Sequence, residues 1–309
     1  MKSIKVFAPA TVANVSCGFD VLGCCLDGVG DEMVISLSEE PGVRITKIDG
    51  ANLPMQAEKN VASVAVMAML EKLTNVEFGI EIEIYKKIKA GSGIGSSAAS
   101  STGAVWGANQ LLGKPFTDKE LIPFAMEGER LASGNAHADN VAPALLGGFT
   151  LVRSYAPLDV LKLHTPEDLY MTIIHPQIEV KTADSRKVIK SNVDLKQAIT
   201  QWGNLGGFIT GLYTNDYNLL ARSLEDVIIE PLRSILIPKF EEVKNAAIDS
   251  GALGAGISGS GPSIFAMSKG KETAQNVAKA IENIYQETGI VFDIHVAEIN
   301  PNGVIEIAN

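Results

Sequence analysis

The stretch from Ile80 to Gly113 constrains the fold more than any other, because it combines a strand, a glycine-rich loop and a helix in direct succession. Isoleucines alternate with polar residues over GIEIEIY, which is the two-residue period of a half-buried strand. After the loop AGSGIGSS, small and apolar residues recur at helical spacing from Ser97 to Leu112, and Pro115 stops the run. Glycines let an anion approach the backbone, and free N–H groups at a helix start favour its charge. The pattern predicts a phosphate-binding loop.

The common phosphate-binding and catalytic templates do not fit this loop. No Lys precedes its serines as a P-loop requires, and Ser96 stands where the dinucleotide fingerprint needs a third glycine. The H-R-D and D-F-G companions of protein kinases are absent, and neither glycine-rich stretch contains G-x-S-x-G. On the glycines alone, a tight turn without any ligand remains an open alternative.

Three motifs together resemble those of the GHMP kinases, a family of small-molecule kinases. The loop is similar to P-x-G-x-G-L-G-S-S-A, with Lys89 in place of Pro and Ile94 in place of Leu. KVFAPATVANVSCGFDVLG near the N-terminus resembles the first family motif, and GALGAGISGSGPSIFAM resembles the third. The resemblance runs from residue 4 to residue 299. The NVSCGFD and HADNVAPALLGG stretches are most similar to the members that phosphorylate L-homoserine.

The resemblance implies an α+β fold of two domains, with residues 1–160 forming a ribosomal-protein-S5-domain-2-like unit and residues 161–309 a ferredoxin-like unit. We place the linker in the stretch 157–166, which is bounded by two prolines. The early strands of the first unit are predicted to form a meander. In the second unit, the order strand, helix, helix, strand, helix, strand independently suggests a split β-α-β arrangement. Residues 251–261 are predicted to be a second glycine-rich loop, and residues 230–251 one helix.

The resemblance also implies a site for ATP and Mg²⁺. Mg²⁺ takes few protein oxygens, and Ser97 and Glu129 would supply them; both are predicted to be catalytic. A lone helical Glu is otherwise usually solvated, and Asn60 could simply cap its helix. The residues predicted to bind the nucleotide are Lys89, Ala90, Gly91, Ser92, Gly93, Ile94, Gly95, Ser96, Ser97 and Asn60.

The implied acceptor is the side-chain hydroxyl of L-homoserine. The predicted contacts are Asn14, Asp20, Asn140, Thr182, Arg186, Arg233, Gly259 and Ser260. Two of these positions have a competing explanation. Asn14 and Asp20 could cap their own loop. Arg233, near the start of a predicted helix where a cation opposes the dipole, indicates anion binding or a surface ion pair.

A dedicated base is not predicted. By the family pattern Asn140, the third predicted catalytic residue, faces the substrate hydroxyl, and an amide cannot accept a proton at neutral pH. Asp139 lies beside it and is the competing candidate. His137 fits proton transfer and a bond to a turn backbone equally well, so no proton transfer is assigned to it.

Composition narrows the partners. The net charge of −10 argues against nucleic-acid and anionic-membrane binding, which require clustered Lys and Arg. Cys17, Cys24 and Cys25 are odd in number and lack metal-ligand spacing, so neither disulfides nor zinc are expected. No leader segment or membrane-spanning run is evident, which predicts a cytoplasmic enzyme. The oligomeric state stays open, with a homodimer one of the forms allowed. Two functional alternatives also remain: another alcohol acceptor such as mevalonate or a sugar, and a ligand sensor that has lost catalysis.

Overall fold

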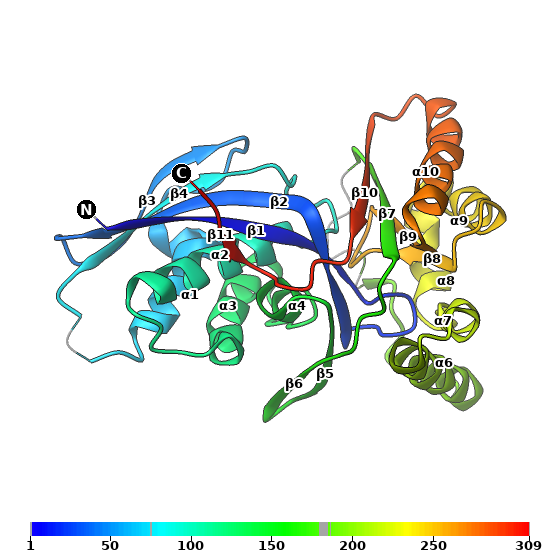
Figure 1. The fold of residues 1–309 in the computed structure, drawn as a ribbon, viewed down its shortest axis with the longest axis horizontal. Coiled ribbons are helices and arrows are strands. Elements are labelled where there is room, and N and C mark those ends of the chain that lie inside the picture. The colour runs from blue at the N-terminus through cyan, green and yellow to red at the C-terminus, as the bar shows by residue number, and fades with distance from the viewer. Residues whose placement is uncertain (1, 75, 179–184, 186, 309) are drawn as a thin grey trace.

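The computed structural model describes residues 2–74, 76–178, 185 and 187–308, and it contains two β-sheets with helices packed against each (Figure 1). The first sheet has seven strands in the described part of the chain. They are β1 (Ser3–Ala13), β2 (Leu22–Ser38), β3 (Gly42–Asp49), β4 (Gly79–Tyr85), β5 (Phe149–Tyr155), β6 (Leu158–Lys162) and β11 (Ile305–Glu306).

The first sheet is not the predicted meander. Its main order is β11-β1-β2-β4-β3, with β5 paired to the first residues of β2 and β6 paired to β5. Strand β4 lies between β2 and β3 and runs parallel to β3. A parallel neighbour needs a crossover connection, and the segment that carries α1 provides it.

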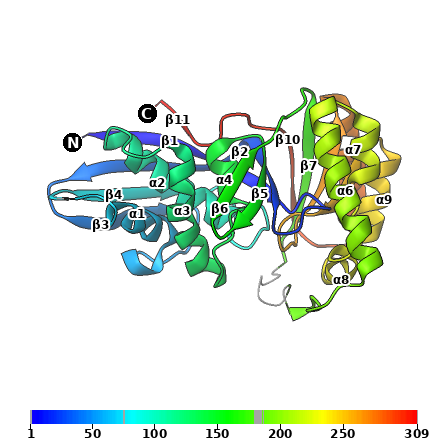
Figure 2. The same ribbon diagram turned by 90° about the horizontal axis from the view of Figure 1, so that it is seen from below.

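Helices α1, α2 and α4 cover one face of this sheet and α3 packs on them, as can be followed in Figure 2. A capping box of Thr117 and Glu120 opens α3, and Pro123 lies inside that helix. Helix α2 packs on β1 and β2 and contacts α1 and α3, so it is buried along most of its length. The bounds are α1 (Val61–Leu70), α2 (Ser96–Leu111), α3 (Asp118–Ser133) and α4 (Val141–Leu146).

The second sheet has the strand order β10-β7-β9-β8 and is antiparallel throughout. With a helical segment after β7 and α10 after β9, this is the split arrangement of a ferredoxin-like fold. One strand was not predicted: β8 lies inside the stretch 251–261, which we expected to be loop alone. The strands are β7 (Leu169–Pro176), β8 (Gly254–Ile257), β9 (Ile264–Lys269) and β10 (Phe292–Glu298).

The helices of the second half lie on the outer side of this sheet (Figures 1 and 2). They are α6 (Leu195–Thr214), α7 (Tyr217–Ser223), α8 (Glu230–Arg233), α9 (Phe240–Asp249) and α10 (Lys271–Gln286). The single helix predicted over residues 230–251 is instead α8, a 3₁₀ turn and α9. Pro238 separates the two because it cannot donate a helical hydrogen bond.

The two halves share a hydrophobic core. One buried cluster contains residues of both sheets, and Phe149 of β5 meets Phe208 of α6 edge to face at 5.6 Å. The chain also returns: after β10 it crosses back and pairs β11 with β1 (Figure 1). Strand β6 lies within the stretch 157–166, so that stretch is not a simple linker. The division at residue 160 stays a prediction. None of the described helices has the length and apolar character needed to cross a membrane.

Candidate active site

A cavity of about 360 Å³ opens where the two glycine-rich loops meet. Its volume is in the range of small-molecule sites. Most of the residues predicted for the site line it: Asn14, Asp20, Ala90, Gly91, Gly93, Gly95, Ser96, Ser97, Glu129, Asn140, Arg233, Gly259 and Ser260. Thr182 and Arg186 lie outside the described residues.

Direct hydrogen bonds join the two loops. The Ser258 hydroxyl donates to the carbonyl oxygen of Gly93 at 2.8 Å, and the Ser263 hydroxyl donates to that of Ser92 at 2.6 Å. Gly93 has a φ of 84°, and a Cβ there would lie 2.7 Å from the carbonyl oxygen of Gly261. Only glycine allows this approach without displacing backbone. The close approach of the two loops is therefore built into the structure.

Four predicted nucleotide residues do not line the cavity. The Lys89 ammonium donates to the Gln177 side chain, Ser92 holds the second loop through its carbonyl oxygen, and Ile94 is buried. Asn60 is also buried, and its side chain accepts from the backbone N–H of Ala62 at 3.0 Å, so it caps α1. These four residues are therefore not part of the lining of the cavity.

Ser97 and Glu129 come together at the cavity wall. Gly128 allows this, because a Cβ there would lie 2.1 Å from the Ser101 hydroxyl, so α2 and α3 approach closely. Glu129 is buried, and its Oε1 atom has no hydrogen-bond partner. Burial raises the pKa of Glu129 to about 7, although a hydrogen bond with the Ser97 side chain lowers it. Glu129 is therefore not the solvated helical carboxylate of the alternative explanation.

A second acidic group faces the same space. Burial raises the pKa of Asp139 to about 7, with smaller contributions in the same direction from the charges of Asp20 and Glu129. The Nδ1 atom of His137 lies 3.8 Å from the Asp20 carboxylate. A cationic ligand would reduce the repulsion between the acidic groups of this wall, because a positive charge stabilises the ionised carboxylates.

Arg233 is buried and is not a surface cation. Its Nε donates to the carbonyl oxygen of Ser185 at 3.0 Å and its Nη1 to that of Gly259 at 3.2 Å. The guanidinium carbon lies 5.0 Å from the centre of the Phe19 ring. Arg233 is the last residue of α8, so the dipole argument made for the start of a longer helix does not apply. The burial of Arg233 argues against the explanation as a surface cation.

Asn14 and Asn140 are both held by the protein. Asn14 accepts from the backbone N–H of Asp20 at 2.9 Å and donates to the carbonyl oxygen of Gly259 at 2.8 Å. Capping of its own loop, the competing explanation, is thus present in the structure. The Thr11 hydroxyl donates to Oδ1 of Asn140 at 2.7 Å. Both amides line the cavity in fixed orientations.

Lys86 and Phe19 line the cavity and were not predicted. A signal existed for Lys86. In the alternation of Ile80, Ile82 and Ile84, the next inward position is residue 86, and a lysine at an inward position calls for a partner. Phe19 lies in the loop between β1 and β2, and it gave no comparable signal.

Behind the cavity, the buried carboxyl group of Glu230 should make the stability of the protein depend on pH. Its carboxylate pairs with Lys244, its Oε2 atom has no partner, and burial raises its pKa to about 7 against the attraction of Lys244. The folded state then holds a proton that the unfolded state releases above its ordinary pKa. This stability, up to about 3 kcal/mol, is present at pH 4 and is lost as pH rises toward 7. The free energy of unfolding of Glu230→Gln, measured with urea, should therefore rise relative to that of the unmodified protein between pH 5 and pH 8.

The matched control is Glu282→Gln, at an exposed position on α10. Its unfolding free energy should keep a constant difference from the unmodified protein over the same range. If Glu230→Gln shows the same constant difference, the carboxyl group does not titrate in this way.

Comparison with known proteins agrees with this geometry. The family model for the GHMP kinases N terminal domain matches residues 60–148, and that for the GHMP kinases C terminal matches residues 208–287. A homoserine kinase of Chlorobium phaeobacteroides is 48% identical, over 98% of this chain and 99% of that protein. The crystal structure of homoserine kinase from Cytophaga hutchinsonii has a TM-score of 0.96 at 55% identity, covering 99% and 98% of the two chains.

More distant structures share the fold. Mevalonate kinase from L. major, solved with R-mevalonate, has a TM-score of 0.71 at 17% identity and covers 96% of each chain. At that identity the likeness concerns the fold alone. The identity and coverage of the nearer relatives decide the matter: this chain belongs to the GHMP kinase family, in the group whose members are named homoserine kinase.

Proposed function

We propose that this protein transfers the γ-phosphoryl group of ATP to the side-chain hydroxyl of L-homoserine, giving O-phospho-L-homoserine for threonine biosynthesis. The observation that carries the proposal is the set of residues that line one cavity. The glycine-rich loop lies on one side of the cavity together with Ser97 and Glu129. Arg233 and the carboxylates of Asp20 and Asp139 line the same space. The first set suits a nucleotide and the second suits an amino acid.

The phosphate end rests on the loop and the start of α2. Gly91 has a φ of 76° and no atom within 4 Å of where a Cβ would be, so an anion has room there. Ser97 and Glu129 would hold Mg²⁺, since the unpartnered Oε1 of Glu129 is a buried oxygen that a cation would satisfy. The ion, when bound, neutralises charge on the transferring phosphate. Among the described residues, no group of three or more His, Cys, Asp or Glu is arranged so that it could hold a metal ion by itself.

The amino-acid end has both signs of charge. The Arg233 guanidinium would pair with the carboxylate of homoserine, and Asp20 and Asp139 would attract its ammonium group. Asn140, held by Thr11, would orient the hydroxyl toward the phosphate. These groups do positioning work, which is most of what phosphoryl transfer requires of a protein.

We expect Asp139→Asn to keep turnover within about tenfold of the unmodified enzyme. In a loose transition state the hydroxyl proton can leave to phosphate or water, so no carboxylate base is required. Asp139 also accepts the backbone N–H of Asn140 at 3.1 Å, which the Asn oxygen can still do. Steady-state kinetics would measure this. A loss near 10⁴-fold, the upper scale for general base catalysis, with ATP binding and fold preserved, would make Asp139 the base.

An ATP-consumption assay with L-homoserine, mevalonate and galactose side by side tests the whole proposal. Turnover with homoserine alone supports the proposal. Turnover with mevalonate or galactose would mean that the acceptor is a different alcohol. No turnover with any of the three compounds would favour a ligand sensor that has lost catalysis. The acidic groups of Asp20 and Asp139 argue against mevalonate and sugars, which lack an ammonium group. Arg233 argues further against sugars, which lack a carboxylate. The proposal includes Mg²⁺ dependence and a cytoplasmic location. Light scattering on the purified chain would establish whether it is a monomer or a homodimer.

A further inference from the structure

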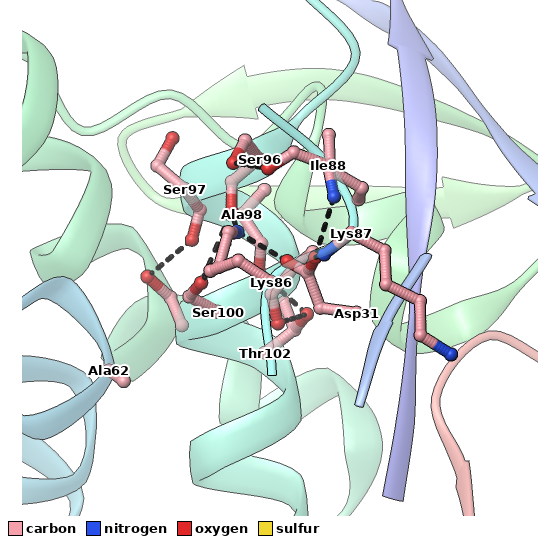
Figure 3. Close-up of polar contacts among 12 residues, drawn as sticks. Asp31, Ala62, Lys86, Lys87, Ile88, Ser96, Ser97, Ala98, Ser100 and Thr102 are labelled. Atoms are coloured by element: carbon pink, nitrogen blue, oxygen red, sulfur yellow. Dashed lines mark hydrogen bonds and ion pairs between the residues drawn. The ribbon is translucent and has the colours of Figure 1, made fainter. Parts of the chain in front are cut away.

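A buried ion pair lies directly behind the phosphate loop. The Lys86 ammonium contacts the Asp31 carboxylate, and the two side chains are 2% and 0% exposed. Asp31 is on β2, and Lys86 directly follows the neighbouring strand β4. Figure 3 shows both side chains pointing toward the start of α2. A buried pair of this kind seldom adds net stability over apolar residues, so another reason for it should be sought.

The pair is bonded to both ends of the loop. On the entry side, Oδ1 of Asp31 accepts the backbone N–H of Lys87 at 2.7 Å and that of Ile88 at 2.9 Å. On the exit side, Nζ of Lys86 donates to the carbonyl oxygen of Ser96 at 3.0 Å. The Ser96 hydroxyl in turn donates to the carbonyl oxygen of Ile88 at 3.0 Å. These hydrogen bonds thus hold together the two ends of the loop formed by residues 89–95.

Lys86 lines the cavity and could be taken for a phosphate ligand like the P-loop lysine. Its bonding argues otherwise. An ammonium group has three N–H donors, and these are directed to Asp31, to the Ser96 carbonyl oxygen and to the Ser100 hydroxyl at 3.1 Å. Its charge is also neutralised by Asp31.

We propose that Lys86 and Asp31 are positioning residues that fix the two ends of the phosphate loop before ATP binds. They set the loop N–H groups and Ser97 in place without touching the nucleotide. This inference rests on the proposed function, because it assumes that ATP phosphates bind at the loop.

Lys86→Met and Asp31→Asn test the inference, with Lys87→Met as the matched control. Lys87 is the next residue, its side chain is 60% exposed, and it pairs with Glu32 at the surface. We expect kcat/KM for ATP to fall about 10²-fold in both buried variants, the scale for a small misplacement of reacting groups. The KM for L-homoserine at saturating ATP and all kinetic constants of Lys87→Met should stay unchanged. A purely structural defect would lower the active fraction without separating the two substrates.

Asp31→Asn separates positioning from direct contact. If Lys86 were a phosphate ligand, releasing it from Asp31 would keep or raise the affinity for ATP, and that result would overturn the inference. Lys86→Met/Asp31→Asn guards against misfolding, because it removes both charges of the buried pair together and leaves an amide oxygen to accept the backbone N–H groups of Lys87 and Ile88. That variant should keep its melting temperature and still lose kcat/KM for ATP. Normal ATP kinetics in the folded double variant would also overturn the inference. An unmodified enzyme that is inactive on homoserine would instead refute the proposed function.

Discussion

Glu129→Gln should lower kcat by about 10²–10³-fold, which is the scale for removing one preorganised charge-stabilising group. The amide keeps the size of the side chain but cannot supply the negative charge that a bound Mg²⁺ requires. The melting temperature without nucleotide should stay the same or rise slightly. The reason is that Glu129 is a buried carboxylate with an unpartnered Oε1, and its charge costs desolvation energy in the folded state.

The same helix offers the control for this experiment. Glu127 is 41% exposed and pairs with Arg130 three residues on, so Glu127→Gln should change neither kcat nor the Mg²⁺ concentration needed for half-maximal rate. Glu129→Gln should shift that concentration upward. Near-normal turnover and an unchanged Mg²⁺ requirement in Glu129→Gln would remove the residue from the proposed metal site.

The parts of the site that could be predicted are those encoded locally. The loop was predictable because glycine spacing, the preceding strand and the following helix lie together in one stretch. The family resemblance then pointed to Glu129, and the close packing of α2 on α3 at Gly128 brings it to Ser97. The ferredoxin-like order was predictable from element succession, although β8 was missed because its GAGI sequence is more typical of a turn than of a strand.

The parts that could not be predicted depend on contacts between distant segments. The bonds from Arg233 to Gly259 and Ser185 require α8 to end there, and only the packed structure shows that end. The place of β4 between β2 and β3 is likewise a tertiary choice, since both neighbours have suitable alternation. Asp31 gave no sign in the sequence of holding the loop, because its partner Lys86 is 55 residues away.

Arg233→Leu should lower kcat/KM for L-homoserine by between about 30-fold and several thousand-fold. This corresponds to about 2–5 kcal/mol for truncating one partner of a buried, hydrogen-bonded charge pair. The loss should fall on homoserine, because the guanidinium is the one buried cation in the described cavity wall besides the neutralised Lys86. Affinity for ATP should stay within about threefold, since the phosphate loop keeps its bonds from Ser258 and Ser263.

Arg233 also donates to the Gly259 carbonyl oxygen, so its removal could act through the second loop instead. Two measurements separate these causes. Arg222→Leu, an exposed arginine on α7, should leave both substrates unaffected and controls for the loss of a positive charge. Decarboxylated homoserine, the amino alcohol without the carboxylate, should be used equally poorly by the unmodified enzyme and by Arg233→Leu if the guanidinium binds that carboxylate. If Arg233→Leu loses ATP and homoserine affinity alike, or loses a further large factor with the amino alcohol, Arg233 serves the loop and the carboxylate is bound elsewhere.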